Sequence, residues 1–386
     1  MSVSHPSSSS VVDRETDAAL AEREPAIARK TRVQAVPTAL PEGTVTVVIP
    51  CFNYARYLPG AVASVLGQEE AIVDVIIVDD ASTDDSLAVA RQLARQDSRI
   101  VVLSHPRNCG PVQTFNDGLA RAKGEFLVRL DADDLLTPGS LKRAIAVMRR
   151  YPSVGLVYGR PLHFRDGEAL PAARERPTSW TIWPGLLWLS DRCRTSTNVI
   201  TSPEALMRRS VVDRVGGQKQ LAHAHDMEMW LRMSAFSDVA YIHGADQAWH
   251  RDHAESLSSR EVDCLCDVTE RRDVFTILFA GLAGQLPEAP ILEQSARAGL
   301  AANVVEIAKR QFDRPGPGRA QVPVLQEVVR GLVADVHSVP GWSGLERRIA
   351  MKPGWSHTRL VFLLERLVRS LRGRYSIWKW NRYGEW

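Results

Sequence analysis

The sequence predicts an α/β protein in which a mainly parallel sheet is flanked by helices and followed by a helical C-terminal extension. Three observations support this fold class. Short β-branched runs alternate with segments of helical periodicity, which is typical of parallel strands joined by crossover helices. Acidic and polar residues directly follow several of these runs, at the place where parallel sheets bind ligands. Beyond residue 261 the periodicity is helical only.

The first half of the chain contains four strand candidates with three helices between them. Most of the strands are runs of Val and Ile without alternation, as expected when both faces of a sheet are covered. The strands are predicted at 45–50, 73–80, 99–105 and 124–134, and the helices at 58–68, 86–96 and 112–123. Residues 154–259 are less regular, with a further strand at VGLVYG and a helix around MEMWLRMSA.

We expect the chain to have three parts. Residues 1–43 are rich in Ser, Ala, Glu, Arg and Pro and are predicted to form a disordered or weakly helical N-terminal arm. Residues 44–260 form the α/β domain, and residues 261–386 form a helical region with a basic, aromatic tail. The helices of that region are predicted at 264–282, 291–310, 322–333 and 357–371, with PGPG at 315–318 as a loop.

Composition narrows the class of protein and its location. With 45% apolar and 24% charged residues, the 386-residue chain can bury a large core. A net charge of +3 gives no reason to expect a nucleic-acid partner. The five cysteines show neither a disulfide-scaffold nor a zinc-site pattern, and no apolar run suits a membrane span or a signal peptide. We therefore expect a cytoplasmic protein.

An acidic cluster, Asp131-Ala132-Asp133-Asp134, stands at the end of the fourth predicted strand. Neighbouring carboxylates repel one another unless a cation or solvent relieves them. Their oxygens suit Mg²⁺ or Mn²⁺, particularly when substrate phosphates complete the coordination shell. The alternative is a solvated acidic turn before the next helix, and the cluster alone leaves both interpretations open.

A second polar cluster, from Asp79 to Asp84, follows the second predicted strand. A carboxylate here could accept a hydrogen bond from a nucleobase imide or a ribose hydroxyl. The alternative is that these residues cap the helix that begins at Ser86. The two interpretations are equally compatible with the local sequence.

Three stretches in order are more specific than any single motif. They are VTVVIPCFNYARYLPGAVASVLGQ, VIIVDDASTDDS and RNCGPVQTFNDGLARAKGEFLVRLDADD. Together they resemble the start of a family 2 glycosyltransferase with the Rossmann-like GT-A fold, over residues 44–148 and more weakly to residue 259. The resemblance implies metal-dependent, inverting transfer of a sugar from a nucleotide-diphosphate donor to an acceptor hydroxyl, in the synthesis of cell-surface polysaccharide or glycoconjugate.

The resemblance also implies the residues of the donor site. Asp80 would recognise the base, and Asp133 of the DxD element would bind the Mg²⁺ or Mn²⁺ ion. Asn116 would hold the loop that contains Gly110. The implied donor-binding residues are Pro50, Phe52, Asn53, Asp80, Arg107, Asn108, Asp131, Ala132, Arg251 and His253.

The segment from His225 to Arg232 resembles the acceptor-site motif of the same family. The resemblance implies that Asp226 is the catalytic general base. His225 stands where the family commonly has an acidic residue, which leaves the tuning of the Asp226 pKa open. A neutral His225 would perturb Asp226 less than a carboxylate would, and a protonated one would lower its pKa. The alternative is that Asp226 only caps the helix.

The segment from Trp249 to Ser258 resembles the stretch that lies over the donor phosphates in the family. It implies that Arg251 and His253 neutralise the diphosphate, or that His253 joins the metal shell. A surface loop with solvated charges is the alternative. The donor could be a UDP-, dTDP- or GDP-sugar, and the acceptor a glycan or a lipid-linked molecule.

The C-terminal tail from Glu346 to Trp386 carries ten Lys or Arg against three Glu. Four leucines share one face of the predicted helix: Leu360, Leu364, Leu367 and Leu371. One interpretation is peripheral contact with an anionic membrane, which would place the protein at the inner face of the membrane. The other is a helix packed on the catalytic core with a solvated basic face.

Two alternative functions are a sugar nucleotidyltransferase and a nucleotide-sugar-binding protein without activity. A sugar nucleotidyltransferase would carry a Gly-rich loop after the first strand, whereas this loop, CFNYARYL, contains no glycine. A nucleotide-sugar-binding protein without activity is favoured only by His225. The aromatic residues Trp180, Trp183 and Trp188 could stack on an acceptor sugar, but core positions are the preferred interpretation.

Overall fold

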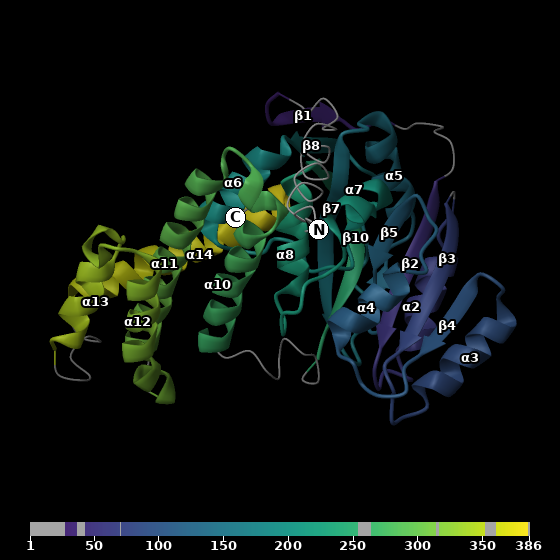
Figure 1. The fold of residues 1–386 in the computed structure, drawn as a ribbon, viewed down its shortest axis with the longest axis horizontal. Coiled ribbons are helices and arrows are strands. Elements are labelled where there is room, and N and C mark those ends of the chain that lie inside the picture. Colours follow the sequence, from purple (N-terminus) through teal and green to yellow (C-terminus); the bar gives the residue numbers. More distant parts are fainter. Residues whose placement is uncertain are drawn as a thin grey trace, which may run out of the picture.

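The computed structural model describes residues 28–36, 43–69, 71–253, 264–313, 316–351 and 360–384. Figure 1 shows a sheet covered by helices on one side of the picture and a group of C-terminal helices on the other. The ten strands of the described residues form one sheet, in the order β1-β8-β10-β7-β9-β5-β2-β3-β4, with β6 paired to β10.

The four predicted strands and three predicted helices of the first half are confirmed. They are β2 (Thr44–Cys51), α2 (Leu58–Leu66), β3 (Ile72–Asp79), α3 (Ser86–Gln96), β4 (Ile100–Ser104), α4 (Pro111–Leu119) and β5 (Phe126–Arg129). The pairs β5–β2, β2–β3 and β3–β4 are all parallel. Their carboxyl ends therefore meet at one edge of the sheet, where Cys51 pairs with Asp79.

The remainder of the sheet is mixed rather than parallel. It comprises β6 (Leu135–Leu136), β7 (Val154–Arg165), β8 (Ser179–Trp183), β9 (Leu206–Arg208) and β10 (Asp238–Asp252). The long strand β10 pairs parallel with β7 but antiparallel with β8 and β6. The short β9 lies antiparallel between β5 and β7 and so joins the parallel half to the rest.

An additional edge strand corrects the prediction for the N-terminal arm. Residues Thr31–Gln34 form β1, which pairs antiparallel with β8. Its burial alternates between half-buried and exposed positions, as expected for an edge strand with one covered face. Residues 1–27 of the predicted arm lie outside the described residues.

Two hydrophobic clusters cover the two faces of the parallel half. Val45, Val47 and Ile49 of β2 belong to one cluster, which includes α2 and α5 (Ser140–Arg150). Val48 belongs to the other, with α4 and α8 (His225–Ser234). Successive residues of a strand point to opposite faces, so an unbroken apolar run is needed to fill both clusters.

The two clusters also contain the tryptophans whose role the sequence left open, Trp180 in the first and Trp183 and Trp188 in the second. Trp180, Trp183 and Trp188 are between 1% and 3% exposed, so the core interpretation is confirmed. The helices next to them are α6 (Gly185–Thr195) and α7 (Arg209–Val215).

The helical C-terminal region is also confirmed. Its elements are α10 (Cys264–Ala280), η1 (Leu282–Gln285), α11 (Ala289–Asp313), η2 (Pro317–Gln321), α12 (Val322–Leu332), η3 (Val336–Ser338), α13 (Trp342–Ile349) and α14 (Leu360–Tyr383). Helix α14 runs behind the other helices back to the sheet (Figure 1), where Tyr158 donates a hydrogen bond of 2.6 Å to the Gly384 carbonyl. Among the described helices, none is long and apolar enough to cross a membrane.

Candidate active site at the strand ends

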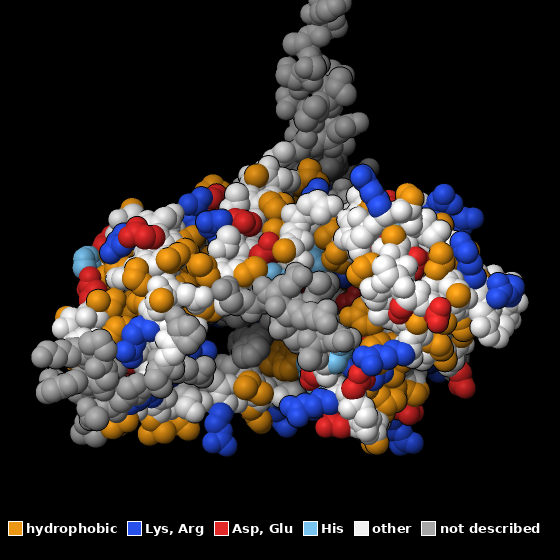
Figure 2. All heavy atoms as spheres, turned by 90° about the horizontal axis from the view of Figure 1, so that it is seen from below, with side chains coloured by type: hydrophobic (Ala, Val, Ile, Leu, Met, Phe, Trp, Pro, Cys, Tyr) orange, Lys and Arg blue, Asp and Glu red, His pale blue; other side chains and the backbone are white. Residues whose placement is uncertain are grey.

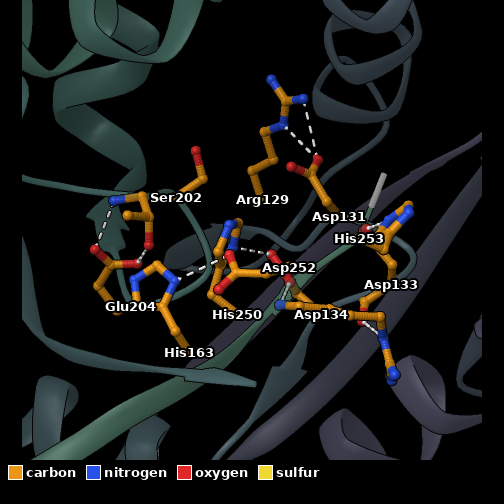
Figure 3. Close-up of polar contacts among 12 residues, drawn as sticks. Arg129, Asp131, Asp133, Asp134, His163, Ser202, Glu204, His250, Asp252 and His253 are labelled. Carbon is orange, nitrogen blue, oxygen red and sulfur yellow. Dashed lines mark hydrogen bonds and ion pairs between the residues drawn. The ribbon is translucent and has the colours of Figure 1, made fainter. Parts of the chain in front are cut away.

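Each carboxylate of the acidic cluster after β5 contacts an arginine or histidine side chain. Figure 3 shows Asp131, Asp133 and Asp134 directed to three different partners. Asp131 pairs with Arg129, Asp133 with His253, and Asp134 with His250. The two histidines come from the end of β10, which the sheet places beside the acidic turn.

Asp133 and His253 form the part of the site that best suits a metal ion. The Asp133 carboxylate lies 2.7 Å from the His253 Nε2, and the two side chains are only 10% and 5% exposed. The Nδ1 atom of His253 is buried and has no hydrogen-bond partner among the described residues. A carboxylate oxygen and an imidazole nitrogen facing one another are donors that Mn²⁺ accepts, so these two predicted residues fit the ion.

Both carboxylate oxygens of Asp134 already contact groups of the protein. One of its oxygens accepts from the Arg251 backbone N–H at 2.8 Å, and the other lies 3.1 Å from the His250 Nδ1. Burial favours neutral forms of both side chains, but the Asp134 carboxylate holds the pKa of His250 well above its usual range. We conclude that Asp134 fixes the end of β10 rather than serving as a free ligand.

Asp131 faces a guanidinium and keeps its charge. Arg129 donates to its carboxylate from Nε at 3.1 Å and also bonds Gln218 at 2.7 Å. Burial raises the pKa of Asp131, but the charge and hydrogen bond of Arg129 act against burial, and the net pKa lies below its usual range. Its side chain is 39% exposed, so Asp131 remains accessible from the solvent side.

Asp226 lies in the first turn of α8, close to this cluster. Its Oδ2 accepts from Asn198 at 3.2 Å and from Ser202 at 3.3 Å, while its Oδ1 accepts from the Met227 backbone N–H at 2.6 Å. Asp226 is not the N-cap, which is Ala224, but one of its oxygens accepts from a backbone N–H of the first turn of the helix. Burial raises the pKa of Asp226, Arg129 lowers it, and Asp131 raises it again. Asp226 is therefore close enough to Arg129 and Asp131 for their charges to affect its pKa.

His225 is neutral in this site. It is 6% exposed, and burial together with the Arg129 charge lowers its pKa to about 3. Of the two alternatives that the sequence left open, the structure favours the neutral imidazole. His225 therefore does not lower the pKa of Asp226 by its own charge.

The guanidinium of Arg251 is committed to protein contacts. It donates to the Asp133 carbonyl at 2.9 Å and to Asp166 at 2.8 Å. Its charge also lies over the rings of Tyr57 and Phe164. In this conformation Arg251 supports the backbone of the acidic turn, and its predicted contact with a diphosphate would require it to leave Asp166.

Asp80 orders the loop from Arg107 to Gly110. Its carboxylate accepts from the backbone N–H groups of Cys109 at 2.8 Å and Gly110 at 2.9 Å, and lies 2.7 Å from the His105 Nδ1. Gly110 has φ +83°, which favours glycine at the start of α4. Asp80 thus positions the loop in which Arg107 and Asn108 are exposed, and its predicted contact with a base stays a prediction.

Asn53 connects two of the predicted donor loops. Its backbone has φ 61°, which Asn tolerates better than most residues. Its side-chain carbonyl accepts from the Thr83 backbone N–H at 2.7 Å, and its own N–H donates to Ser82. Beside it, Phe52 is 41% exposed and Pro50 is half-buried.

Tyr54 extends this connection to the acidic cluster. Its ring lies 5.9 Å from that of His253, and the Asp133 charge contributes to raising its pKa after burial. The loop after β2, the loop after β3 and the acidic turn are therefore adjacent. Ala132, between the two aspartates of the DxD element, is 1% exposed and belongs to the core.

Asn116 has a different role from the one predicted. Its side chain brackets the backbone of Gln218, donating to the carbonyl and accepting from the N–H, both at 2.9 Å. It therefore holds the turn at Gly217 and not the loop at Gly110. A Cβ at Gly217 would lie 2.3 Å from the Asn116 Oδ1, so the close approach requires glycine.

Sequence reasoning missed several residues of the site. Arg129 precedes the acidic cluster and His250 precedes Arg251, so both were within reach of a search for charge partners. Glu204 had no local pattern that marked it. It is buried, it accepts hydrogen bonds from Thr201, and burial raises its pKa to about 7.

Two other groups of the described residues each bring three possible metal-ligand atoms within 4.8 Å of one another. They are Asp80, His105 and Cys109, and His163, His250 and Asp252.

Comparison with known proteins shows what the α/β domain is similar to. Residues 46–216 match the model of the glycosyl transferase family 2. An uncharacterized glycosyltransferase of Nostoc is 40% identical over 30% of this chain and 35% of its own length. A putative teichuronic acid biosynthesis glycosyltransferase, TuaG of Bacillus subtilis, is 32% identical over 36% of this chain and 54% of its own length. The chain thus spans about a third to a half of these relatives.

Solved structures show the same fold. Residues 1–349 of S. aureus TarS in complex with UDP-GlcNAc superpose with a TM-score of 0.57 at 16% identity, covering 79% of this chain and 88% of that one. The mannosyltransferase PcManGT from Pyrobaculum calidifontis, in complex with GDP-Man and Mn²⁺, gives 0.50 at 17% identity and covers 94% of both chains. The fold class predicted from the sequence is confirmed.

Proposed function

Because residues 46–216 belong to glycosyl transferase family 2, we propose that the protein transfers a sugar from a nucleotide-diphosphate donor to an acceptor hydroxyl with inversion at the sugar carbon. The observation that supports this proposal is that Asp226 lies close to Asp131, which belongs to the same acidic turn as Asp133 of the cation-compatible pair. Asp226 lies within electrostatic reach of Asp131, and the same acidic turn holds Asp133 at 2.7 Å from His253. A proton acceptor and a diphosphate-binding group thus share one site.

Asp226 would act as the general base. Its Oδ2 is oriented by Asn198 and Ser202, so the carboxylate has a fixed direction before an acceptor arrives. The acceptor oxygen forms a bond to the anomeric carbon while its proton passes to Asp226. The bond from that carbon to the diphosphate breaks on the opposite side, and the nucleoside diphosphate leaves with the electron pair.

Asp133 and His253 would hold the Mg²⁺ or Mn²⁺ ion. When bound, such an ion neutralises the charge that develops on the leaving diphosphate. The two side chains are almost fully buried, which strengthens their electrostatic effect relative to one in water. Asp131 stays charged and partly exposed, so it is placed to contact the donor or a water on the ion.

The loops after β2, β3 and β4 would bind the nucleotide. Asp80 and Asn53 determine their shape through backbone hydrogen bonds, which leaves exposed side chains such as Phe52 for the base. Arg107 and Asn108 are exposed on the third of these loops. The bound UDP-GlcNAc in TarS and GDP-Man in PcManGT support a nucleotide-sugar donor, and the name of TuaG supports a role in polysaccharide synthesis.

A panel of nucleotide sugars tests this function. Thermal unfolding is measured with UDP-, dTDP- and GDP-sugars, each with and without Mn²⁺. We expect one nucleotide class to raise the midpoint of unfolding only with the ion, and that donor to be hydrolysed slowly without an acceptor. Binding without any turnover, with or without acceptor glycans, would contradict the enzymatic role. No stabilisation by any member would contradict the donor site itself.

A further inference from the structure

We propose that α14 attaches the protein to an anionic lipid bilayer by lying in the plane of its surface. Seven large apolar or aromatic side chains of this helix are between 45% and 61% exposed, and six of them lie along one side: Leu364, Leu367, Val368, Leu371, Tyr375 and Trp378. They recur at spacings of three and four residues, so they form one stripe along the helix. We call this set the apolar stripe of α14. An exposed stripe of this size on a folded helix indicates a contact surface.

The opposite face of α14 is already bound to the protein. Phe362 is 2% exposed, and Glu365 pairs with Arg348 at 2.8 Å. Arg369 pairs with Glu306 at 3.0 Å, and the Trp380 indole donates to the Val199 carbonyl at 2.9 Å. The helix therefore cannot rotate to bury the apolar stripe without breaking these contacts.

Leu364, Leu367 and Leu371 of the predicted leucine face are thus exposed. The helix packs on the protein through other residues and carries exposed arginines, as the packed-helix alternative expects, so membrane contact through the leucines stays a proposal. Figure 2 shows hydrophobic side chains along the lower edge of the molecule with Lys and Arg side chains beside them. This edge is the side on which α14 lies behind the other helices in Figure 1.

The charges beside the stripe identify the partner. Between Leu360 and Gly384 the sequence has six Lys or Arg and a single acidic residue, Glu365, which faces Arg348 in the protein. Arg372, Arg374 and Arg382 are exposed. An apolar face flanked by cations is the pattern of helices that insert at the boundary between headgroups and acyl chains of anionic membranes.

A second copy of this chain is a poorer match for the same surface. Two stripes packed on each other would bring the arginines of both helices together without acidic partners on that face. The stripe from Leu364 to Trp378 is about 21 Å long at 1.5 Å per residue, which suits a helix lying along a surface.

Docking in this orientation has a consequence for the candidate site. Trp380 contacts Val199, and the neighbouring Asn198 donates to Asp226. The end of α14 is therefore close to the segment that orients the proposed base. Because Trp380 lies on the face opposite the apolar stripe, α14 would stand between the lipid surface and this segment.

Flotation of the full chain with lipid vesicles tests the proposal and needs no glycosyl transfer. Vesicles of phosphatidylcholine alone are compared with vesicles that also contain phosphatidylglycerol. We expect binding to the anionic vesicles only, weakened by added salt. The double variant Arg372→Gln, Arg374→Gln should bind about 30-fold more weakly, from the typical contribution of two basic residues at an anionic surface. Leu367→Ser with Leu371→Ser should abolish flotation.

Matched controls lie on other helices. Ile291 and Val324 are also exposed apolar residues, at 73% and 46%, and Arg91 and Arg95 are exposed on α3. Their changes to Ser and Gln should leave flotation unchanged. Equal flotation of all variants, or no flotation of the wild type, would overturn the proposal. Light scattering that shows a dimer lost only in the stripe variants would identify a second copy as the partner instead.

Discussion

At the scale of single residues, the environment of Asp226 explains how one carboxylate can remain a base. Its oxygens accept hydrogen bonds from Asn198, Ser202 and the Met227 N–H, which favour the charged form. Burial acts in the opposite direction and raises the pKa above its ordinary value. The Asp226 carboxylate therefore binds a proton more readily than an exposed aspartate does.

The change Asp226→Asn removes the base and preserves the shape of the site. We expect kcat to fall by about 10² to 10⁴-fold, the usual contribution of a positioned base. Binding of the donor should be unchanged because the amide can still contact Asn198 and Ser202. Transfer rates and donor affinity measured on the same preparation check both statements. Wild-type turnover in this variant would show that another group takes the proton.

The buried, neutral state of His225 predicts how the free energy of unfolding depends on pH. Its pKa of about 3 in the folded state lies below the ordinary value of about 6.5. At a pH between these two pKa values, the folded state therefore binds fewer protons than the unfolded state. The free energy of unfolding contributed by His225 is therefore present above about pH 6.5 and decreases as the pH falls, by about 2 kcal/mol at pH 5. Denaturant unfolding of wild type and His225→Asn across this range should give a shallower pH dependence for the variant.

The exposed His337 provides the control, since 71% of its side chain is exposed. His337→Asn should retain the pH dependence of the wild type. If His225→Asn and the wild type lost stability in parallel between pH 6.5 and 5, the neutral, buried state of His225 would be refuted.

How far the sequence predicts the site can be seen at these same residues. Asp133 and His253 were paired from the motifs, and the structure brings them within 2.7 Å. Arg129 was not predicted although its partner Asp131 is two residues away, and Glu204 was not predicted because its burial comes from the fold and leaves no local pattern. The role of Asn116 was assigned to the wrong loop, since its partner Gln218 is 102 residues away.

At the scale of elements, helix α4 is fitted closely to the sheet. A Cβ at Gly118 would lie 2.4 Å from a methyl of Val48 and 3.0 Å from one of Val78. Val48 belongs to β2 and Val78 to β3, the two strands whose ends carry donor loops. The position of α4, and with it the loop at Gly110, therefore depends on the absence of a side chain at Gly118.

The change Gly118→Ala tests this packing. We expect it to lower the free energy of unfolding by about 1 to 3 kcal/mol, as overpacking of a rigid contact does. Gly331→Ala on α12 is the matched control, since a Cβ there meets nothing within 4 Å. That control should be neutral or stabilising by up to about 1 kcal/mol, because Ala is the better helix former. Equal stabilities of the two variants would contradict the packing described for α4.

Elements with a regular repeat were predicted well, and elements with long-range partners were not. The helix at 86–96 and the first three parallel strands have uninterrupted local patterns, and their bounds agree closely with the structure. The fourth strand, predicted at 124–134, is shorter and spans Phe126–Arg129. Strand β10 contains Gly244, Asp246 and Gln247, which interrupt the apolar pattern. Asp246 is nevertheless 1% exposed, because Arg174 and Arg160 neutralise it. Such compensation by a distant residue leaves no local signal.

At the scale of the whole molecule, the C-terminal helices and the sheet are connected through buried charge. Arg348 is fully buried and pairs with Asp313 of α11 at 3.1 Å and with Glu365 of α14 at 2.8 Å. At its other end α14 bonds the sheet through Gly384 and Tyr158. The helix that carries the apolar stripe is thus fixed at both ends, so its orientation relative to the site is defined.

In the proposed function, Asp133 and His253 hold a divalent ion at the strand ends. This ion would bind the diphosphate of the donor, and Asp226 would take the proton of the acceptor. Electron paramagnetic resonance of Mn²⁺ with UDP or GDP measures this most directly. We expect the wild type to bind Mn²⁺ in the presence of the nucleotide, Asp133→Ala to lose at least about tenfold in affinity, and Asp213→Ala, an exposed acid on α7, to match the wild type. Wild-type Mn²⁺ binding in Asp133→Ala would contradict the account.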